Sequence, residues 1–482
     1  MRGWTVIASL LLLSGASCGP RDTTPPTVVS ITPTSGEQGV RLDRAFAVVF
    51  SEPLAHASFT SDNVAFEAGG VKLEVAVERG ADDRTMRIRP VEQPAELPST
   101  ATVRLLGTIS DRAGNPLAPY SWSFELADWI PLGGLLNRNP EEDVHSLSLV
   151  WMEGPVLAWS EQVGNAPKVF AARWNEEAGR WEALGDEIGG GRGDVGSMPN
   201  LAVYGDRLHA VWKAVVSSDH RIFHAYWDGQ AWQNTAEALN HAARNAQFPV
   251  AAAGDRLWAA WYEYDTTPTY YGVFSTYDGS GWREGSPDWC PSGPRCKPTD
   301  LLVRGGEAWL AYDLESGDAY VVRFDGSGWN PLGGGFDADA SSRTHSYGVR
   351  LTRTPEGELV ALWYELNHSH AAVWDGAQWR VLGTTVTRGT GASAGDVAAS
   401  EHGLFAAVQE IYLGARLYVR RWDESGGRWD DLGRELAYVK LQGAFFSNVK
   451  MVLDGEGWPL LAWIVDDGSA WHLYAARYNH VQ

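Results

Sequence analysis

A unit of about fifty residues recurs seven times through the last three quarters of the chain, and it limits the possible fold more than any other feature. Each unit has a landmark residue at the centre of an apolar stretch, and successive landmarks lie 45 to 55 residues apart. The landmarks are Trp159, Trp212, Trp261, Tyr312, Trp363, Val408 and Trp463. Groups of four short strands at this period are typical of propeller blades. We therefore predict an all-β chain whose residues 128–482 form a seven-bladed β-propeller, with eight blades as the alternative.

The turn between the third and fourth strands of a unit repeats as an aromatic residue, Asp and Gly, followed by Trp. Trp227-Asp228-Gly229 precedes Trp232, and Trp374-Asp375-Gly376 precedes Trp379. Asp and Gly tolerate the left-handed conformations that tight turns need. The chain has 24 Trp residues. Because the repeated ones hold fixed places in the strands, we expect them to pack between blades rather than to stack on a sugar.

The last unit lacks its outer strand, and a matching segment lies in front of the first unit. Trp129-Ile130-Pro131-Leu132-Gly133 resembles Trp329-Asn330-Pro331-Leu332-Gly333. Closing a ring of blades removes the unpaired strand edges that a linear array would expose. We therefore expect residues 128–134 to complete the seventh blade.

The preceding segment, residues 27–127, shows short alternating strands separated by turn residues, which predicts a β-sandwich. Two of its motifs are Phe50-Ser51-Glu52-Pro53 and Asp111-Arg112-Ala113-Gly114-Asn115-Pro116. With these motifs the segment closely resembles the bacterial Ig-like domain found in S-layer and other surface proteins. The resemblance implies an Ig-like stalk.

The amino terminus has the layout of an export signal. Met1–Ser17 contains a positive residue, an apolar core and small residues before Cys18, which is typical of a cleaved signal peptide. Leu13 to Cys18 resembles a bacterial lipobox, which implies that Cys18 is lipid-modified. Residues 18–26 then form a polar, Pro-rich tether. We expect a lipoprotein held at the outer membrane or cell surface by its lipid anchor alone, with plain secretion as the alternative.

Charge and cysteine content narrow the possible partners. The formal net charge is −21 at pH 7, which repels phosphate backbones and argues against nucleic acid as a partner. Cys290 and Cys296 lie close together in a Pro/Gly segment, which predicts a local disulfide in an exported protein. No set of residues indicates a metal or another cofactor.

Two groups of residues are candidates for ligand binding. A Glu lies two positions after four of the landmarks, at Glu161, Glu263, Glu365 and Glu410. Aromatic and carboxylate residues two apart on a strand share one face, so these acids could form a ring that binds a cation or a hydroxyl-rich ligand. The alternative is that they solvate strand ends or pair with Arg. Tyr264 and Tyr271, in the more elaborate third unit, are the aromatic candidates.

The repeats resemble kelch-like and sialidase-like propellers in a general way, without the signature motifs of either family. No nucleophile elbow, metal-spaced His cluster or phosphate loop is present. We therefore expect a non-catalytic surface protein that presents a propeller for binding a glycan or an envelope or extracellular protein. The alternatives are a divergent glycoside hydrolase or lyase, and a structural envelope protein.

Overall fold

The computed structural model describes most of the chain as two compact units, residues 1–127 with 480–482, and residues 128–479. Within these units the described residues are 22–40, 46–91, 100–190, 195–265, 269–285, 289–290, 295–315, 317–336, 338, 345–411, 415–433, 436–439, 446–466 and 468–480. Apart from two short 3-10 turns, η1 (His56–Ser58) and η2 (Ser61–Asn63), the regular elements of these residues are all β-strands.

The first unit is a sandwich of two four-stranded antiparallel sheets. One sheet has the order β1 (Val28–Thr32), β2 (Phe46–Phe50), β6 (Thr85–Pro90), β5 (Val75–Arg79), and the other β4 (Val71–Leu73), β3 (Val64–Ala68), β7 (Thr100–Leu105), β8 (Tyr120–Glu125). Alternate residues of β2 are buried, as expected for a strand with one face on a core. Phe46 lies 5.4 Å from both Phe66 and Phe124 between ring centroids, so the two sheets meet through aromatic side chains.

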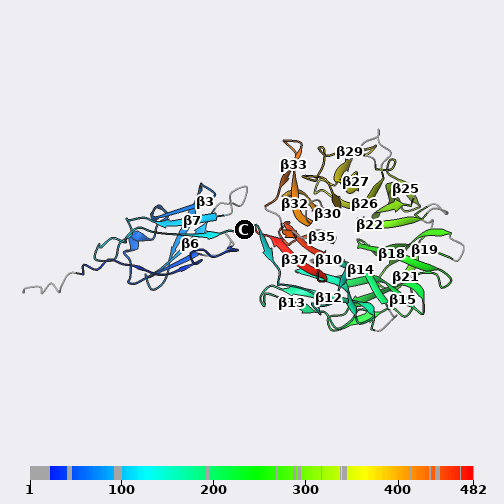
Figure 1. Cartoon of the computed structure of the whole chain (residues 1–482), viewed down its shortest axis with the longest axis horizontal. Helices are drawn as coiled ribbons and strands as arrows, with labels where there is room; N and C mark the ends of the chain where they lie inside the picture. The colour runs from blue at the N-terminus through cyan, green and yellow to red at the C-terminus, as the bar shows by residue number, and fades with distance from the viewer. Residues whose placement is uncertain are drawn as a thin grey trace, which may run out of the picture. The chain divides into compact units, whose positions relative to one another are not determined.

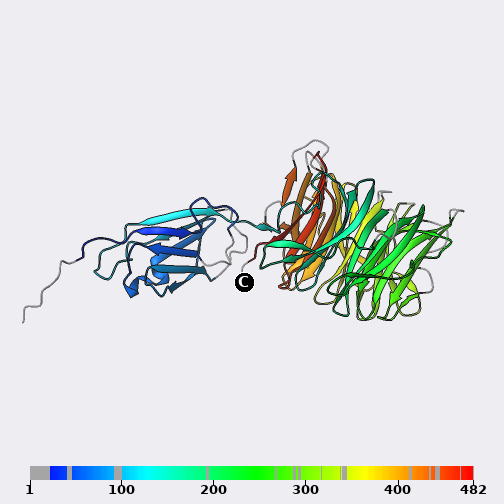
Figure 2. The ribbon, with the colours of Figure 1, turned by 90° about the horizontal axis from the view of Figure 1, so that it is seen from below.

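The second unit is a ring of seven antiparallel blades, which confirms the predicted propeller and its blade count. Figure 1 looks down on the ring, with the first strand of each blade toward the middle, and Figure 2 shows the ring edge-on. Blades 1 to 3 comprise β10 (Val144–Trp151), β11 (Pro155–Val163), β12 (Ala166–Asn175), β13 (Arg180–Ala183); β14 (Val195–Tyr204), β15 (Arg207–Val216), β16 (Asp219–Trp227), β17 (Trp232–Asn234); β18 (Asn245–Ala253), β19 (Leu257–Tyr264), β20 (Tyr270–Tyr277), β21 (Trp282–Glu284).

Blades 4 to 7 follow the same order from the inner strand outward. They comprise β22 (Cys296–Arg304), β23 (Glu307–Leu314), β24 (Ala319–Phe324), β25 (Trp329–Pro331); β26 (Ser346–Arg353), β27 (Leu359–Glu365), β28 (His368–Trp374), β29 (Trp379–Val381); β30 (Ala392–Ser400), β31 (Gly403–Glu410), β32 (Ala415–Asp423), β33 (Arg428–Asp431), with β34 (Ala437–Val439) also on β32; and β35 (Phe446–Leu453), β36 (Pro459–Asp466), β37 (Trp471–Tyr478), β9 (Trp129–Pro131). The second strand of each blade is buried on both faces, which explains its almost continuous apolar sequence.

The seventh blade is closed by the segment that precedes the first blade, as predicted. In β9, Trp129 pairs with Tyr478 and Pro131 pairs with Ala476 of β37. The Trp129 and Tyr478 rings also meet edge to face, with centroids 5.3 Å apart. Strands from the two ends of the propeller sequence therefore share one sheet, so that neither leaves an open edge there.

The repeated Trp-x-x-Leu-Gly sequence joins neighbouring blades. The Trp181 indole N–H donates to the carbonyl of Leu132 in the preceding blade at 2.8 Å, and Trp379 donates in the same way to Leu332 at 2.9 Å. The Gly after each Leu has a positive φ, and a Cβ on Gly333 would lie 3.3 Å from the Trp379 ring. We call this contact the Leu-Gly clasp. Further pairs are Trp232 with Leu184 and Trp429 with Leu382.

At two junctions the Leu-Gly sequence of the clasp is missing, those between blades 2 and 3 and between blades 3 and 4. The fourth strand of blade 2 continues as Thr235-Ala236, and that of blade 3 as Gly285, so neither has the Leu-Gly sequence. The indole nitrogens of Trp282 and Trp329, which would donate there, are buried without a hydrogen-bond partner among the described residues. Blades 2 to 4 therefore form the irregular part of the ring.

Candidate functional site

The four recurring Glu residues are buried near one end of the propeller. This is the end where the second and third strands of a blade join and the fourth strand leads into the next blade; we call it the mouth end. Glu263 and Glu365 are each 0% exposed. The landmark Trp two residues earlier donates its indole N–H to the carboxylate, at 2.7 Å for Glu161, 3.0 Å for Glu263 and 3.1 Å for Glu365.

These carboxylates also accept hydrogen bonds from the loop that enters their own blade. Glu161 accepts from the backbone N–H groups of Arg138 and Asn139 at 2.9 and 2.7 Å. Glu263 accepts from the backbone N–H and the side chain of His241 at 3.1 and 2.7 Å. The carboxylates are therefore engaged in holding the loops between blades, and a ligand role for them stays a prediction.

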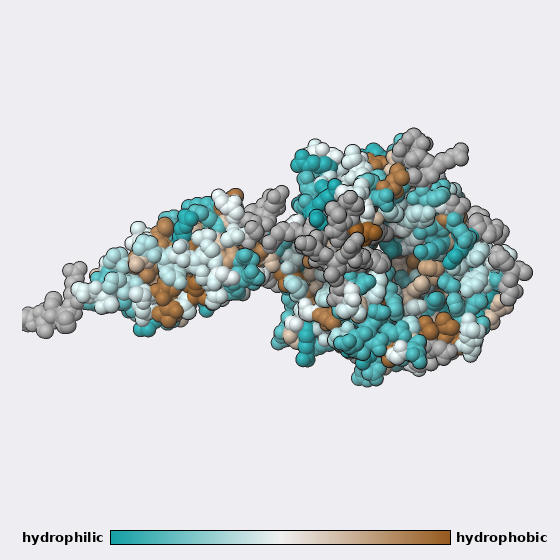
Figure 3. Space-filling model, in the orientation of Figure 1, coloured by the Kyte–Doolittle hydropathy of each residue, from teal (hydrophilic) through white to brown (hydrophobic). Residues whose placement is uncertain are grey.

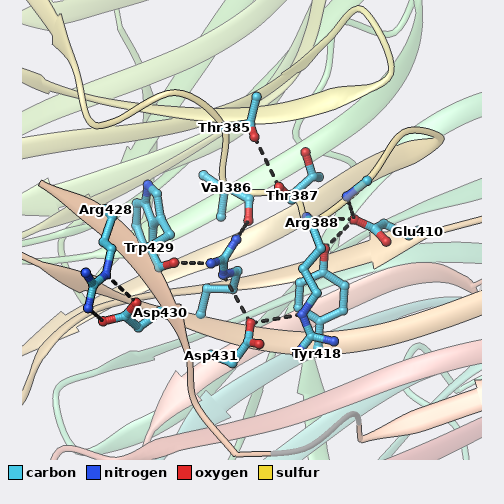
Figure 4. Close-up of polar contacts among 12 residues, drawn as sticks. Thr385, Val386, Thr387, Arg388, Glu410, Tyr418, Arg428, Trp429, Asp430 and Asp431 are labelled. Atoms are coloured by element: carbon cyan, nitrogen blue, oxygen red, sulfur yellow. Dashed lines mark hydrogen bonds and ion pairs between the residues drawn. The ribbon is translucent and has the colours of Figure 1, made fainter. Parts of the chain in front are cut away.

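Blade 6 keeps the same acid with a different donor. Its landmark is Val408, which has no N–H to donate, and Tyr418 on the neighbouring strand donates its hydroxyl to Glu410 instead (Figure 4). Glu410 also accepts from the backbone N–H of Arg388 at 2.9 Å, and the Arg388 guanidinium lies over the Tyr418 ring and pairs with Asp431 at 2.9 Å. Burial is the largest cause of the raised pKa of Tyr418, followed by its hydrogen bond to Glu410.

A group of tyrosines lies at the mouth end of blade 3. Tyr262 and Tyr264 alternate on β19 with Trp261 and Glu263 and so take the opposite face of the strand. The ring centroids of Tyr262, Tyr264 and Tyr270 lie 5.8 to 6.2 Å apart. Tyr262 is buried, whereas Tyr264 and Tyr270 are partly exposed. The Tyr264 and Tyr270 rings can therefore contact a ligand, and the buried Tyr262 ring packs against both of them.

Polar side chains from three blades surround these rings. Gln247 donates to the Tyr264 hydroxyl at 3.3 Å and lies 3.0 Å from His220 Nδ1, and His220 Nδ1 is 3.5 Å from the Tyr264 hydroxyl. Arg295 donates to the Tyr262 hydroxyl through Nε at 3.1 Å and Nη2 at 2.8 Å. We call His220, Gln247, Tyr262, Tyr264, Tyr270 and Arg295 the mouth cluster.

A bulge in the inner strand of blade 3 shapes one side of the mouth cluster. The pairing of β18 with β19 shifts between Gln247 and Val250, and Phe248 takes a φ of 54°. A bulge redirects side chains, and here Phe248 stacks on Tyr262 at 5.9 Å. The Lys297 ammonium lies 4.6 Å from the centre of the Phe248 ring, so a cation borders the cluster.

Burial affects the ionisable groups of this region. It is the largest cause of the lowered pKa of His220, to which nearby Lys213 also contributes. Burial also lowers the pKa of Lys213 and raises that of Tyr262. On the blade 4 side, burial raises the pKa of Asp313 to about 6. His220 is therefore mainly neutral at neutral pH and can accept or donate a hydrogen bond.

The structure brings only one of the two predicted tyrosines into the mouth cluster. Tyr271 pairs with Glu263 across the strands and lies under Arg244, whose guanidinium carbon is 3.7 Å from its ring centre. Sequence reasoning missed His220, Gln247 and Arg295, which lie on different strands and segments and follow no repeat. The available signal was the loss of the Leu-Gly sequence in blades 2 and 3.

The disulfide is confirmed between Cys290 and Cys296, whose Cα atoms are 6.3 Å apart. Both cysteines are buried in the core shared by blades 3 and 4. The disulfide joins the segment after blade 3 to the start of β22, directly after Arg295. Cys18, the predicted lipid site, lies outside the described residues.

Comparisons with known proteins support the two-part architecture. Residues 22–125 match the family model of the bacterial Ig-like domain, which confirms the predicted resemblance, and a propeller follows. No curated protein matches the chain. An Ig-like domain and a disulfide indicate a secreted or surface protein. Among the described residues, none forms a helix long and apolar enough to span a membrane.

Solved structures resemble the chain at low identity. An ulvan lyase of polysaccharide lyase family PL25 is 13% identical with a TM-score of 0.49, over 73% of this chain and 94% of that one. The Trypanosoma rangeli sialidase is 11% identical with a TM-score of 0.44, over 70% of this chain and 55% of that one, so the chain spans about half of its length. YCF48 bound to D1 peptide is 13% identical with a TM-score of 0.43, over 74% of this chain and 97% of that one. At these values the likenesses carry no information on activity.

Proposed function

We propose that this protein binds a saccharide at the mouth cluster of its propeller. The observation that carries the proposal is the combination of two partly exposed rings, Tyr264 and Tyr270, with hydrogen-bonding groups fixed around them. Ligand sites commonly pair aromatic surface with a few oriented polar groups, and sugars present both apolar ring faces and hydroxyls. The face of the propeller drawn in Figure 3 is mostly hydrophilic, with scattered apolar patches.

Binding to a glycan array, followed by titration with the best saccharide, tests this proposal. Replacing both Tyr264 and Tyr270 by Ala is expected to weaken binding roughly tenfold or more, because each aromatic contact contributes about 0.5–1.5 kcal/mol. Tyr364→Ala is the matched control, since Tyr364 lies on the same end of blade 5 and donates only to Asn367 at 3.0 Å. Unchanged saccharide binding by the double variant would overturn the proposal.

We further propose that the propeller is held at the cell surface through a lipid on Cys18, with the Ig-like domain between the anchor and the propeller in the sequence. The support is the lipobox-like sequence before Cys18 and the Ig-like family match. Labelling cells with a tagged fatty acid tests it. The native chain should carry the label and fractionate with the outer membrane, and Cys18→Ala should lose both properties.

A second candidate function, a lyase acting on uronate polymers, is favoured by the 3.5 Å approach of His220 Nδ1 to the Tyr264 hydroxyl. A neutral His220 would remove the proton next to the uronate carboxylate. A carbon–carbon double bond would then form as the glycosidic oxygen leaves with a proton from Tyr264. Incubation with acidic polysaccharides distinguishes the two functions: a rise in ultraviolet absorbance from unsaturated product supports the lyase, and binding without this rise supports a binding protein.

A further inference from the structure

Four charged residues occupy one register of the inner strands in blades 4 to 7. Asp300, Arg350, Asp396 and Lys450 each follow the strand irregularity on β22, β26, β30 and β35. In blades 1 to 3 the inner-strand residues that pair with the residue before the landmark are Ser148, Asn200 and Val250. These strands line the middle of the ring (Figure 1). The charges are therefore confined to one side of the central channel.

These charged groups act on one another electrostatically. Arg350 in blade 5, Asp396 in blade 6 and Asp300 in blade 4 all influence the pKa of Lys450 in blade 7, although blades 4 and 5 are not neighbours of blade 7 in the ring. Burial is the largest cause of the lowered pKa of Lys450, yet its side chain keeps some accessible surface. Both properties are expected of a side chain that protein surrounds in a narrow channel.

The two acids and the two bases differ in their hydrogen bonds. Asp300 accepts from the backbone N–H groups of Leu301 at 2.9 Å and Leu351 at 2.7 Å. Asp396 accepts in the same way from Val397 at 3.0 Å and Met451 at 2.8 Å. Each carboxylate thus ties its inner strand to the next, and backbone amides already stabilise much of its negative charge.

The bases keep unused donors. Arg350 donates through Nη1 to the Thr299 carbonyl, while its Nε is buried without a partner among the described residues. Among the described residues, the Lys450 side chain forms no ion pair within 4.0 Å and no hydrogen bond. A half-buried cation without a close hydrogen-bond partner is costly to maintain, and such groups call for an explanation.

We propose that the channel wall around Arg350 and Lys450 is a binding site for an oxyanion, either a small free anion or a carboxylate or sulfate group of a larger ligand. The free edge of Arg350 suits a planar or tetrahedral oxyanion, and Lys450 adds a point charge. Two residues further along the same strands the side chains are apolar or small, and most of them pack against the next blade: Val150, Ala202, Ala252, Leu302, Thr352, Ala398 and Val452. Since the charged register lies between this apolar stretch and the mouth end, we infer that the anion enters from the mouth end.

Thermal unfolding of the full chain in sulfate, acetate or chloride at equal ionic strength tests the site. Sulfate or acetate should raise the unfolding temperature in a saturable way. Lys450→Met should weaken the apparent anion affinity roughly tenfold or more, the scale of a lost charge-assisted hydrogen bond, and Lys450→Arg should retain most of the response. Lys168→Met is the control, since Lys168 pairs with Glu187 at 3.5 Å on blade 1.

Lys450→Met should also be at least as stable as the native chain without the anion, because it removes a buried charge that lacks a close partner. No saturable response in the native chain, or an equal response in Lys450→Met, would overturn the proposal. These measurements use inorganic anions, so their outcome is separate from saccharide binding at the mouth cluster.

Titration with an acidic polysaccharide identifies the source of the anion. Polygalacturonate and the same polymer with its carboxyl groups reduced are titrated into the native chain and into Lys450→Met. If the carboxylate belongs to the saccharide, the native chain prefers the acidic polymer and Lys450→Met loses that preference. A sulfate response without any such preference assigns the site to a free anion.

Discussion

The clasped and unclasped junctions of the propeller differ in what holds them together. At the clasped junctions, an indole N–H of one blade meets a Leu carbonyl of the blade before it, as between Trp232 and Leu184. Between blades 2 and 3 this bond is missing, and a stacked histidine pair takes its place near Tyr277 and Trp282. A ring nitrogen of His209 lies 2.9 Å from a ring nitrogen of His224. The ring centroids of His224 and Trp282 are 5.1 Å apart.

This difference coincides with the location of the mouth cluster. His220 comes from blade 2, Tyr262 from blade 3, and Arg295 from the segment that enters blade 4, so the cluster spans the two unclasped junctions. In the clasped blades, by contrast, the connecting loops begin at the repeated Leu-Gly sequence. Where the Leu-Gly sequence is missing, the connection between blades has a different sequence. The connection before Arg295, for example, contains the disulfide between Cys290 and Cys296.

Acid should destabilise the unclasped junction between blades 2 and 3 more than the rest of the ring. Burial lowers the pKa of His209 to about 4 and that of His224 to about 3, from an ordinary value of 6.5. The unfolded chain therefore binds more protons below pH 6.5, and the stability from these groups is lost as the pH falls toward 4 and 3. We expect a loss of roughly 3 kcal/mol or more between pH 6.5 and 4.

Denaturant unfolding at a series of pH values measures this loss. His209→Phe combined with His224→Phe should flatten the pH dependence in that window, while His145→Phe, which replaces an exposed histidine of β10, should leave it unchanged. An equally steep acid loss in the double variant would show that other groups cause it. The double variant leaves the neighbours of the histidine pair unchanged, namely Tyr204, Tyr226, Tyr277 and Arg207.

Removing a repeated carboxylate tests whether the repeated residues serve packing. Glu263→Ala leaves the Trp261 indole N–H and the His241 backbone N–H without their acceptor, so the free energy of unfolding should fall by about 3 kcal/mol. Glu284→Ala is the control, because this exposed acid makes only a 3.3 Å ion pair with His241. If Glu263→Ala kept its stability and lost saccharide binding instead, the acid would be a ligand residue.

The sequence predicted the repeated parts of the fold well because their physical causes are local. Blade number, ring closure and the third-to-fourth-strand turn all follow from residues at fixed spacing, such as Trp129-Ile130-Pro131-Leu132-Gly133. The close pairing of Cys290 with Cys296 could be predicted for the same reason. Such features need only strand periodicity and turn chemistry.

The candidate site was less predictable because its parts meet only in the folded ring. His220 and Arg295 are 75 positions apart in the sequence, and no spacing rule joins them. The recurring acids could be recognised as a series, yet their burial could not, since sequence does not show that loop N–H groups converge on Glu161. The charges at Asp300, Arg350, Asp396 and Lys450 fall into one register only when the strand irregularities are known.

The smallest expected effect concerns the glycine of a clasped junction. Gly333 has a φ of 76°, and a side chain there would meet the Trp379 and Trp374 rings at 3.3 and 3.4 Å. Gly333→Val should therefore destabilise the propeller by about 2 kcal/mol, from backbone strain and from displacement of Trp379. Gly334→Ala is a matched control, since a Cβ on the adjacent glycine would meet no atom within 4 Å.

The Trp379 environment distinguishes the clasp from general strain. If the clasp holds blades 4 and 5 together, Gly333→Val should also increase hydrogen exchange at the Trp379 indole, because its bond to the Leu332 carbonyl is lost. Trp329, whose indole N–H has no partner among the described residues, should show no change. Destabilisation without faster exchange at Trp379 would mean that strain alone acts and that clasped and unclasped junctions are held by the same ring packing.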